Sequence, residues 1–122
     1  MSYDWGPHFL VPSGVLDKYS GHVRLREQLD EELLQKELKD LGFSGVIRRI
    51  TNPWYYRKKG AQTWIKLGES DDKLENFPVS WETTTLENGA YEVMGMMHVF
   101  GEKDNVECGI ARQSVVEITL EN

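Results

Sequence analysis

The chain has 122 residues, of which 39% are hydrophobic and 28% are charged, a balance typical of one folded domain and too apolar for a disordered chain. Its 20 acidic and 14 basic residues give a formal net charge of -6, which argues against a nucleic-acid binder because phosphate contacts require a basic surface. The same charge argues against an anionic membrane surface as a partner.

The first 21 residues predict an extended arm. This segment holds three of the eleven glycines and two of the four prolines and shows no helical period, so we expect at most one short strand near 9–11. The pattern then changes to apolar residues that alternate with polar ones, which indicates a half-buried strand. These apolar residues are Val23, Leu25 and Leu29. We therefore divide the chain into an arm, 1–21, and a folded domain, 22–122.

One α-helix is predicted, at about 30–41. Asp30 is a suitable N-cap, and two glutamates follow it in the first turn, where the helix dipole favours negative charge. Leu34, Leu38 and Leu41 repeat at spacings of four and three residues and form one apolar stripe, and the glycine that follows is a natural left-handed stop. The stripe must be buried, either on the domain's own sheet or against a partner or a second copy.

The rest of the chain predicts β-strands. Runs of alternating apolar and aromatic residues are separated by polar turns and by an acidic loop, 68–76 (GESDDKLEN). With the earlier segments this makes about seven short strands, a number and spacing typical of an antiparallel β-sandwich. The expected strands in this part are 46–56, 63–67, 77–83, 91–99, 106–111 and 114–120.

The segment 80–93 (SWETTTLENGAYEV) carries a recognisable motif. It resembles the second half of bacterial immunoglobulin-like (Big-type) modules, in which a strand ends in Trp-Asp-Thr-Thr, a Leu-x-Asn-Gly-x-Tyr corner follows and the last strand is rich in valine. Glu82 stands where those modules have aspartate, and the predicted helix departs from their usual short connection. The matching residues are Trp81, Leu86, Asn88, Gly89 and Tyr91.

The resemblance implies an Ig-like antiparallel β-sandwich of about seven strands with one inserted helix. We expect Trp81 to point into the core and Asn88-Gly89 to form a turn in which positive φ is favourable. Tyr91 is placed as a tyrosine corner, whose hydroxyl donates a hydrogen bond to the backbone a few residues upstream. Modules of this type are commonly joined to surface proteins and carbohydrate-active enzymes, where they space, dock or bind glycans.

The sequence contains no motif of a catalytic or metal site. His8, His22 and His98 lie far apart in the chain without metal-ligand spacing. Cys108 is the sole cysteine, so it forms no intrachain disulfide, and no neighbouring base is placed to activate it. There is no phosphate-binding glycine loop and no nucleophile elbow. We therefore expect no enzyme, no cofactor and no metal.

The best candidate for binding is the segment 52–64 (NPWYYRKKGAQTW), in which four aromatic residues are interleaved with basic ones. In a strand, Trp54 and Tyr56 share one face and Tyr55 takes the other, so at least one ring should be exposed. Exposed rings stack on sugars and anchor protein interfaces, although cross-strand packing with a cation over a ring explains the same residues. The candidate binding residues are Trp54, Tyr55, Tyr56, Arg57 and Trp64.

The sequence therefore predicts a non-catalytic Ig-like accessory or interaction module that spaces or docks within or to a larger bacterial protein. The alternative is a carbohydrate-binding module that uses the aromatics of 52–64. The expected partner is a protein, a parent enzyme domain or a glycan, and a homo-oligomer is compatible with both. No segment reaches the roughly 18 apolar residues of a membrane span, and 1–12 lacks the features of a signal peptide. We expect no membrane insertion and a cytoplasmic location, or an extracellular one if the chain was cut from a secreted parent.

Overall fold

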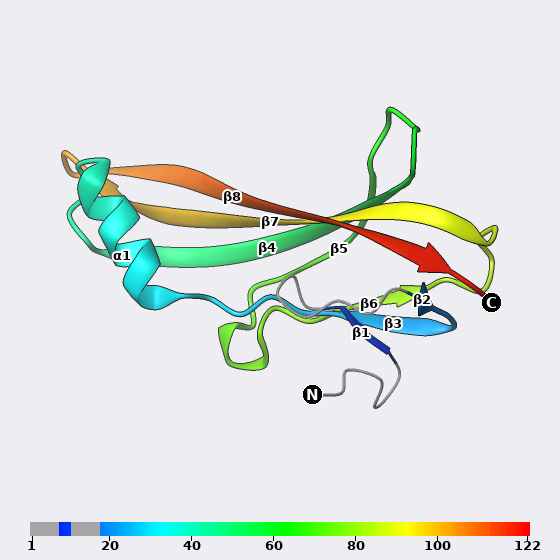
Figure 1. Ribbon diagram of the computed structural model, residues 1–122. Helices are drawn as coiled ribbons and strands as arrows, with labels where there is room; N and C mark the ends of the chain where they lie inside the picture. Colours follow the sequence, from blue (N-terminus) through cyan, green and yellow to red (C-terminus); the bar gives the residue numbers. More distant parts are fainter. Residues whose placement is uncertain (1–7, 11–17) are drawn as a thin grey trace.

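The computed structural model describes residues 8–10 and 18–122, and it confirms the predicted mainly-β class with one α-helix (Figure 1). Most of the arm predicted at 1–21 lies outside the described residues. The elements are β1 (His8–Leu10), β2 (Lys18–Tyr19), β3 (His22–Leu25), α1 (Glu31–Asp40), β4 (Ile47–Lys58), β5 (Ile65–Ser70), the 3₁₀ turn η1 (Lys73–Glu75), β6 (Val79–Glu82), β7 (Gly89–Lys103) and β8 (Val106–Leu120).

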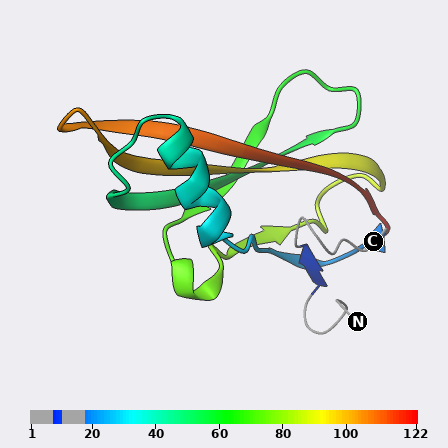
Figure 2. The same cartoon turned by 60° about the vertical axis from the view of Figure 1, so that its left-hand side comes forward.

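The strands form a large sheet and a small one. The large sheet has the order β2-β8-β7-β4-β5, and the small sheet has the order β1-β3-β6. The β7–β8 pair is antiparallel over its whole length, whereas β1 pairs with β3, and β2 with β8, in parallel. The chain crosses from the large sheet to the small one between β2 and β3, at Gly21, where a φ of 69° favours glycine. The small sheet and α1 lie on the same side of the large sheet, so its other face is left without a covering layer of described residues (Figures 1 and 2).

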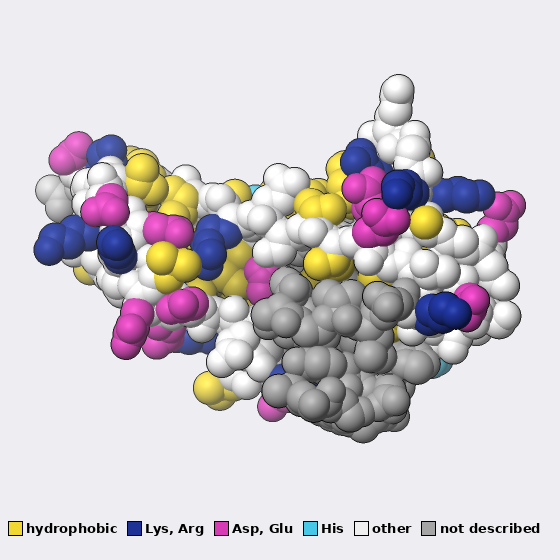
Figure 3. Space-filling view, viewed as in Figure 1, with side chains coloured by type: hydrophobic (Ala, Val, Ile, Leu, Met, Phe, Trp, Pro, Cys, Tyr) yellow, Lys and Arg dark blue, Asp and Glu magenta, His cyan; other side chains and the backbone are white. Residues whose placement is uncertain are grey.

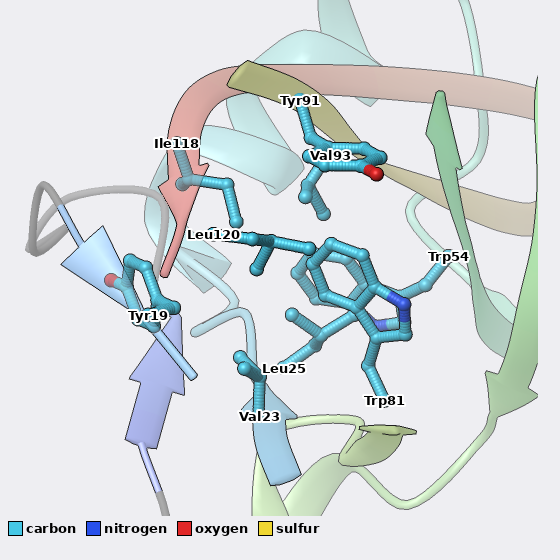
Figure 4. Packing of buried hydrophobic residues seen from close by; sticks show 9 residues of the cluster. All are labelled: Tyr19, Val23, Leu25, Trp54, Trp81, Tyr91, Val93, Ile118 and Leu120. Atoms are coloured by element: carbon cyan, nitrogen blue, oxygen red, sulfur yellow. The ribbon is translucent and has the colours of Figure 1, made fainter. Parts of the chain in front are cut away.

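A hydrophobic cluster fills the space between the two sheets (Figure 4). Val23 and Leu25 of β3 and Trp81 of β6 meet side chains from β4, β7 and β8, and all of them are buried. Tyr19 of β2 belongs to the same cluster, so a residue that the sequence assigned to the arm contributes to the core. The members from the large sheet are Trp54, Tyr91, Val93, Ile118 and Leu120.

A second hydrophobic cluster lies beneath the helix. Leu34 and Leu38 are fully buried and pack with Met97 and Val99 of β7, so the helix covers its own sheet. Leu41, the third leucine of the predicted stripe, is 50% exposed. It occupies the C-cap position, where the backbone leaves the helix, and its side chain therefore no longer follows the helical stripe.

The predicted helix is confirmed together with its capping. The side chain of Asp30 accepts a hydrogen bond from Leu33 N at 3.1 Å, as an N-cap should. At the other end Gly42 has a φ of 84°, and Phe43 N donates to Leu38 O at 2.9 Å. This is the left-handed stop that the glycine predicts.

Several predicted strand boundaries are wrong, and 1–21 contains two short strands, β1 and β2, where at most one was expected. The segments 106–111 and 114–120 form one strand, β8, because Arg112 and Gln113 are polar but pair in register with β7 instead of turning. The loop predicted at 68–76 begins later, because β5 continues to Ser70 along β4. The strand predicted to continue to Leu29 ends at Leu25, and Glu27 N then donates to Asn76 O at 2.9 Å.

Candidate functional site

Two of the predicted binding residues face the core. Trp54 is only 1% exposed, and its indole Nε1 donates to Phe77 O at 3.3 Å. The ring of Tyr56 packs at 5.2 Å from the ring of Trp81 and at 6.3 Å from that of Tyr91, measured between centroids. Trp54 is therefore no surface platform, because the small sheet covers the face of β4 on which it lies, and Tyr56 shares that face.

The other three candidate residues lie on the opposite side of the large sheet. The guanidinium of Arg57 stacks over the ring of Trp64 at 4.1 Å, and its Nε donates to Glu92 Oε1 at 3.0 Å. Trp64 belongs to the β4–β5 connection, which rises from the sheet on the side away from α1 (Figure 1). Arg57 and Trp64 thus form a cation–ring pair, which is the packing role that the sequence offered as the alternative to ligand binding. Tyr55 lies on the same face of the sheet and is half-exposed.

We call this side of the large sheet the outer face. Side chains alternate along a strand, so the neighbours of the buried Trp54 and Val93 point outward. The β-ladder aligns Tyr55 of β4, Met94 of β7 and Val115 of β8 in one row, in which Val115 is 43% exposed and Met94 only 5%. The other large outer-face side chains on these strands are Met96, His98 and Phe100.

Charged groups border this apolar row and are already paired. Arg49 lies 3.9 Å over the ring of Phe100 and is 3.5 Å from Glu107, measured from Nε to Oε1. Lys66 donates to Glu69 at 2.9 Å, a bond that raises the pKa of the lysine. Basic and acidic side chains are also intermixed on the side of the molecule from which α1 is seen (Figure 3). These basic groups therefore do not form the continuous positive surface that a nucleic acid requires.

The corner residues come together around Tyr91, but the hydrogen-bonded turn lies at Thr83–Leu86 and not at the predicted Asn88-Gly89, where Gly89 already begins β7. Trp81 is buried between the sheets, and Leu86 packs against the same cluster. The hydroxyl of Tyr91 donates to Glu87 O at 2.7 Å, four residues upstream, and burial raises the pKa of this phenol. Gly89 has a φ of 139°, which favours glycine at the start of β7.

Asn88 has a role that the sequence did not reveal. Its Oδ1 accepts a hydrogen bond from Asn122 N at 2.9 Å. The side chain of Asn122 accepts from Gly21 N at 2.9 Å and donates to Thr83 O at 2.8 Å. Asn122 therefore connects the β2–β3 turn with the segment that follows β6, and Asn88 holds the backbone of Asn122 in place. No local sequence pattern predicts it, because its partners are far apart in the chain.

Two buried polar residues were also missed. Glu27 is 8% exposed and Asn52 is fully buried, and neither Glu27 Oε2 nor the side-chain amide of Asn52 has a hydrogen-bond partner among the described residues. Burial raises the pKa of Glu27, and the charge of Arg112 opposes this increase less strongly. A signal was present for Glu27, which follows Val23 and Leu25 in the same alternation.

The part of the chain that the structure describes contains no group of three or more His, Cys, Asp or Glu side chains placed to hold a metal ion. Cys108 in β8 is half-buried. Within the same described ranges, no helix has both the length and the apolar character needed to cross a membrane.

The fold and the outer face together define a mainly-β protein with one helix and an aromatic and arginine-containing sheet face. Comparison of the chain with protein-family models, with curated proteins and with solved structures finds no match.

Proposed function

We propose that the protein is a non-catalytic Ig-like accessory or interaction module, and that a protein partner docks on its outer face. The observation that carries the proposal is the row of Tyr55, Met94 and Val115, which paired charges border: Val115 is 43% exposed and Tyr55 half-exposed, whereas Met94 between them is only 5% exposed. An apolar centre with a polar rim is the usual anatomy of a protein interface.

The composition of the face supports a protein partner. Tyrosine, tryptophan, phenylalanine, methionine and arginine are the residue types enriched at protein interfaces, and all five types occur here. Arginine and glutamate form pairs within the face, such as Arg57 with Glu92, and leave the apolar row uncharged. The complementary surface of the partner is therefore apolar at its centre.

The strand order supports the Ig-like part of the proposal. In an Ig-like domain strands C, F and G adjoin in one sheet and B pairs with E in the other. Here β4, β7 and β8 adjoin in that order, and β3 pairs with β6. Tyr91 stands near the start of β7 as a tyrosine corner stands near the start of strand F. The short parallel pairs of β1 and β2 and the α1 insertion are departures from the antiparallel pattern.

The test uses site-specific cross-linking in the cell that makes the protein. A photoreactive amino acid replaces Val115 on the outer face or, as a matched control, Val106, which is 60% exposed at the far end of β8. We expect a discrete cross-linked protein from position 115 alone. Purified partner should then bind Val115→Arg at least tenfold more weakly than wild type and bind Val106→Arg normally. Equal cross-linking at both positions, or equal affinity of both variants, would refute the proposal.

A carbohydrate ligand is the second candidate, favoured by the outward position of Tyr55 and Trp64. A panel of soluble polysaccharides titrated against intrinsic tryptophan fluorescence tests it. Because Trp54 is in the core, the informative variant is Trp64→Ala, with circular dichroism to show that the fold is intact. A fluorescence response that this variant abolishes supports glycan binding, and no response across the panel excludes these polysaccharides as ligands.

A further inference from the structure

Glu27 is a buried carboxyl group at the boundary between the two hydrophobic clusters. It lies in the linker 26–30, between β3 of the small sheet and α1. A methyl group at Gly95 of β7 would lie 3.1 Å from Glu27 Oε2 and 3.0 Å from Cζ3 of Trp54, so the carboxyl and the indole both adjoin this glycine. The linker thus inserts an ionisable group against the inner face of the large sheet.

The surroundings of this carboxyl contain little that stabilises a negative charge. On β4 and β7 the neighbours are Trp54 and Gly95, neither of which carries a charge. Arg112 of β8 is the charge that acts on the carboxyl, and it is shared with Glu37 of α1, whose Oε2 lies 3.7 Å from Arg112 Nε.

Charged residues flank Glu27 along its own linker. Arg26 is partly exposed and has an interaction of its own, and Asp30 is exposed and caps α1. From the β5–β6 connection the backbone carbonyl of Asn76 accepts from Glu27 N, and Lys73 pairs with Glu31 at the start of α1. None of these groups offers a hydrogen bond to Glu27 Oε2.

The helix that follows the linker is held by few contacts. Leu34 and Leu38 are its buried residues, and ion pairs at Glu31 and Glu37 connect it to Lys73 and Arg112. Beneath it lies the second hydrophobic cluster, which includes Met97 and Val99 of β7. A displacement of the linker would therefore move α1 and expose apolar surface on this half of the sheet.

We propose that Glu27 is a pH-sensitive latch: the linker and α1 stay on the sheet while its carboxyl is neutral and buried, and its ionisation releases them. The sign follows from burial. The pKa of Glu27 is raised above the ordinary 4.5 because burial penalises the charged form. The closed form is fully stable below the ordinary pKa and loses stability as the pH rises through the raised one. Release at high pH then exchanges a buried carboxylate, whose Oε2 has no hydrogen-bond partner among the described residues, for a hydrated one.

The test combines hydrogen exchange with NMR titration of the Glu27 carboxyl carbon. Protection factors for the amides of Leu34 and Leu38 in α1 and of Val93 and Val99 in β7 are measured at pH 5 and pH 8. The variants are Glu27→Gln and, as a matched control, Glu32→Gln, which changes an exposed glutamate of the first helical turn.

We expect the protection of α1 to fall at least tenfold from pH 5 to pH 8 in wild type and in Glu32→Gln, and to stay constant in Glu27→Gln. The protection of β7 should change much less. Protection of α1 that does not depend on pH, or that falls equally in Glu27→Gln, would overturn the proposal. An equal fall in the protection of α1 and β7 in the wild type would also overturn the proposal, because it would indicate global unfolding. This comparison uses the wild type alone, so it tests the proposal even if Glu27→Gln fails to fold.

Discussion

The hydroxyl of Tyr91 provides the sharpest test of the corner. Tyr91→Phe removes one oxygen and leaves the ring, which packs between Tyr56 and Trp81, in place. The lost hydrogen bond, 2.7 Å from Tyr91 Oη to Glu87 O, is worth about 1 kcal/mol net. Glu87 is exposed, so water can hydrate its freed carbonyl, and the penalty for an unsatisfied buried acceptor does not add to this value.

Urea unfolding followed by tryptophan fluorescence measures the effect. We expect a loss of about 1 kcal/mol at unchanged m-value, and a fall in Tm of about 3–5 °C for a domain of this size. Tyr55→Phe is the matched control: its ring lies on the outer face, and the change should stay within about 0.5 kcal/mol of wild type. If Tyr91→Phe and Tyr55→Phe unfold at the same urea concentration, the hydroxyl does not stabilise the corner and the reasoning fails.

Two further substitutions test the connections between the sheets. Asn122→Ala removes the side chain that bonds Gly21 N and Thr83 O, and it should lower the free energy of unfolding by about 1 kcal/mol in chemical denaturation. The control Glu121→Ala breaks one exposed ion pair with Lys18 and should leave the stability nearly unchanged. Equal stability of these two variants would contradict the role assigned to Asn122. Gly95→Ala places a methyl group 3.0 Å from the Trp54 ring and should cost about 1–3 kcal/mol. Gly68→Ala is the control, because its methyl group would lie 3.2 Å from the Val79 side chain and should destabilise the protein less. If thermal unfolding shows a smaller loss of stability for Gly95→Ala than for Gly68→Ala, the side chains around Gly95 can move to accommodate the methyl group.

Local signals account for what the sequence predicted well. The helix was located because its cap, its acidic first turn and its terminal glycine lie within a dozen residues of one another. The alternation of Trp54, Tyr55 and Tyr56 between two faces was also predictable from strand geometry. Which face is the core was not, because that depends on β3 and β6 packing over β4 from distant parts of the chain.

Long-range contacts explain the remaining differences. β8 was divided into two predicted strands because Arg112 and Gln113 resemble a turn locally, yet the fifteen residues of β7 provide partners along the whole of β8. The burial of Glu27 opposes the usual preference of carboxylates for water. A local conflict of this kind marks a strained or functional position more often than an ordinary one.

The hydrogen bond between Gly21 N and Asn122 Oδ1 joins residues that are 101 positions apart. A contact of that span forms only after a large loss of chain entropy, whereas the β7–β8 hairpin pairs neighbouring segments across a short turn. The hairpin is therefore suited to form early, and the joining of the β2–β3 turn to the end of β8 is suited to form late. During synthesis this last connection cannot form until residue 122 has emerged, whereas β7 and β8 can pair as soon as both strands are available.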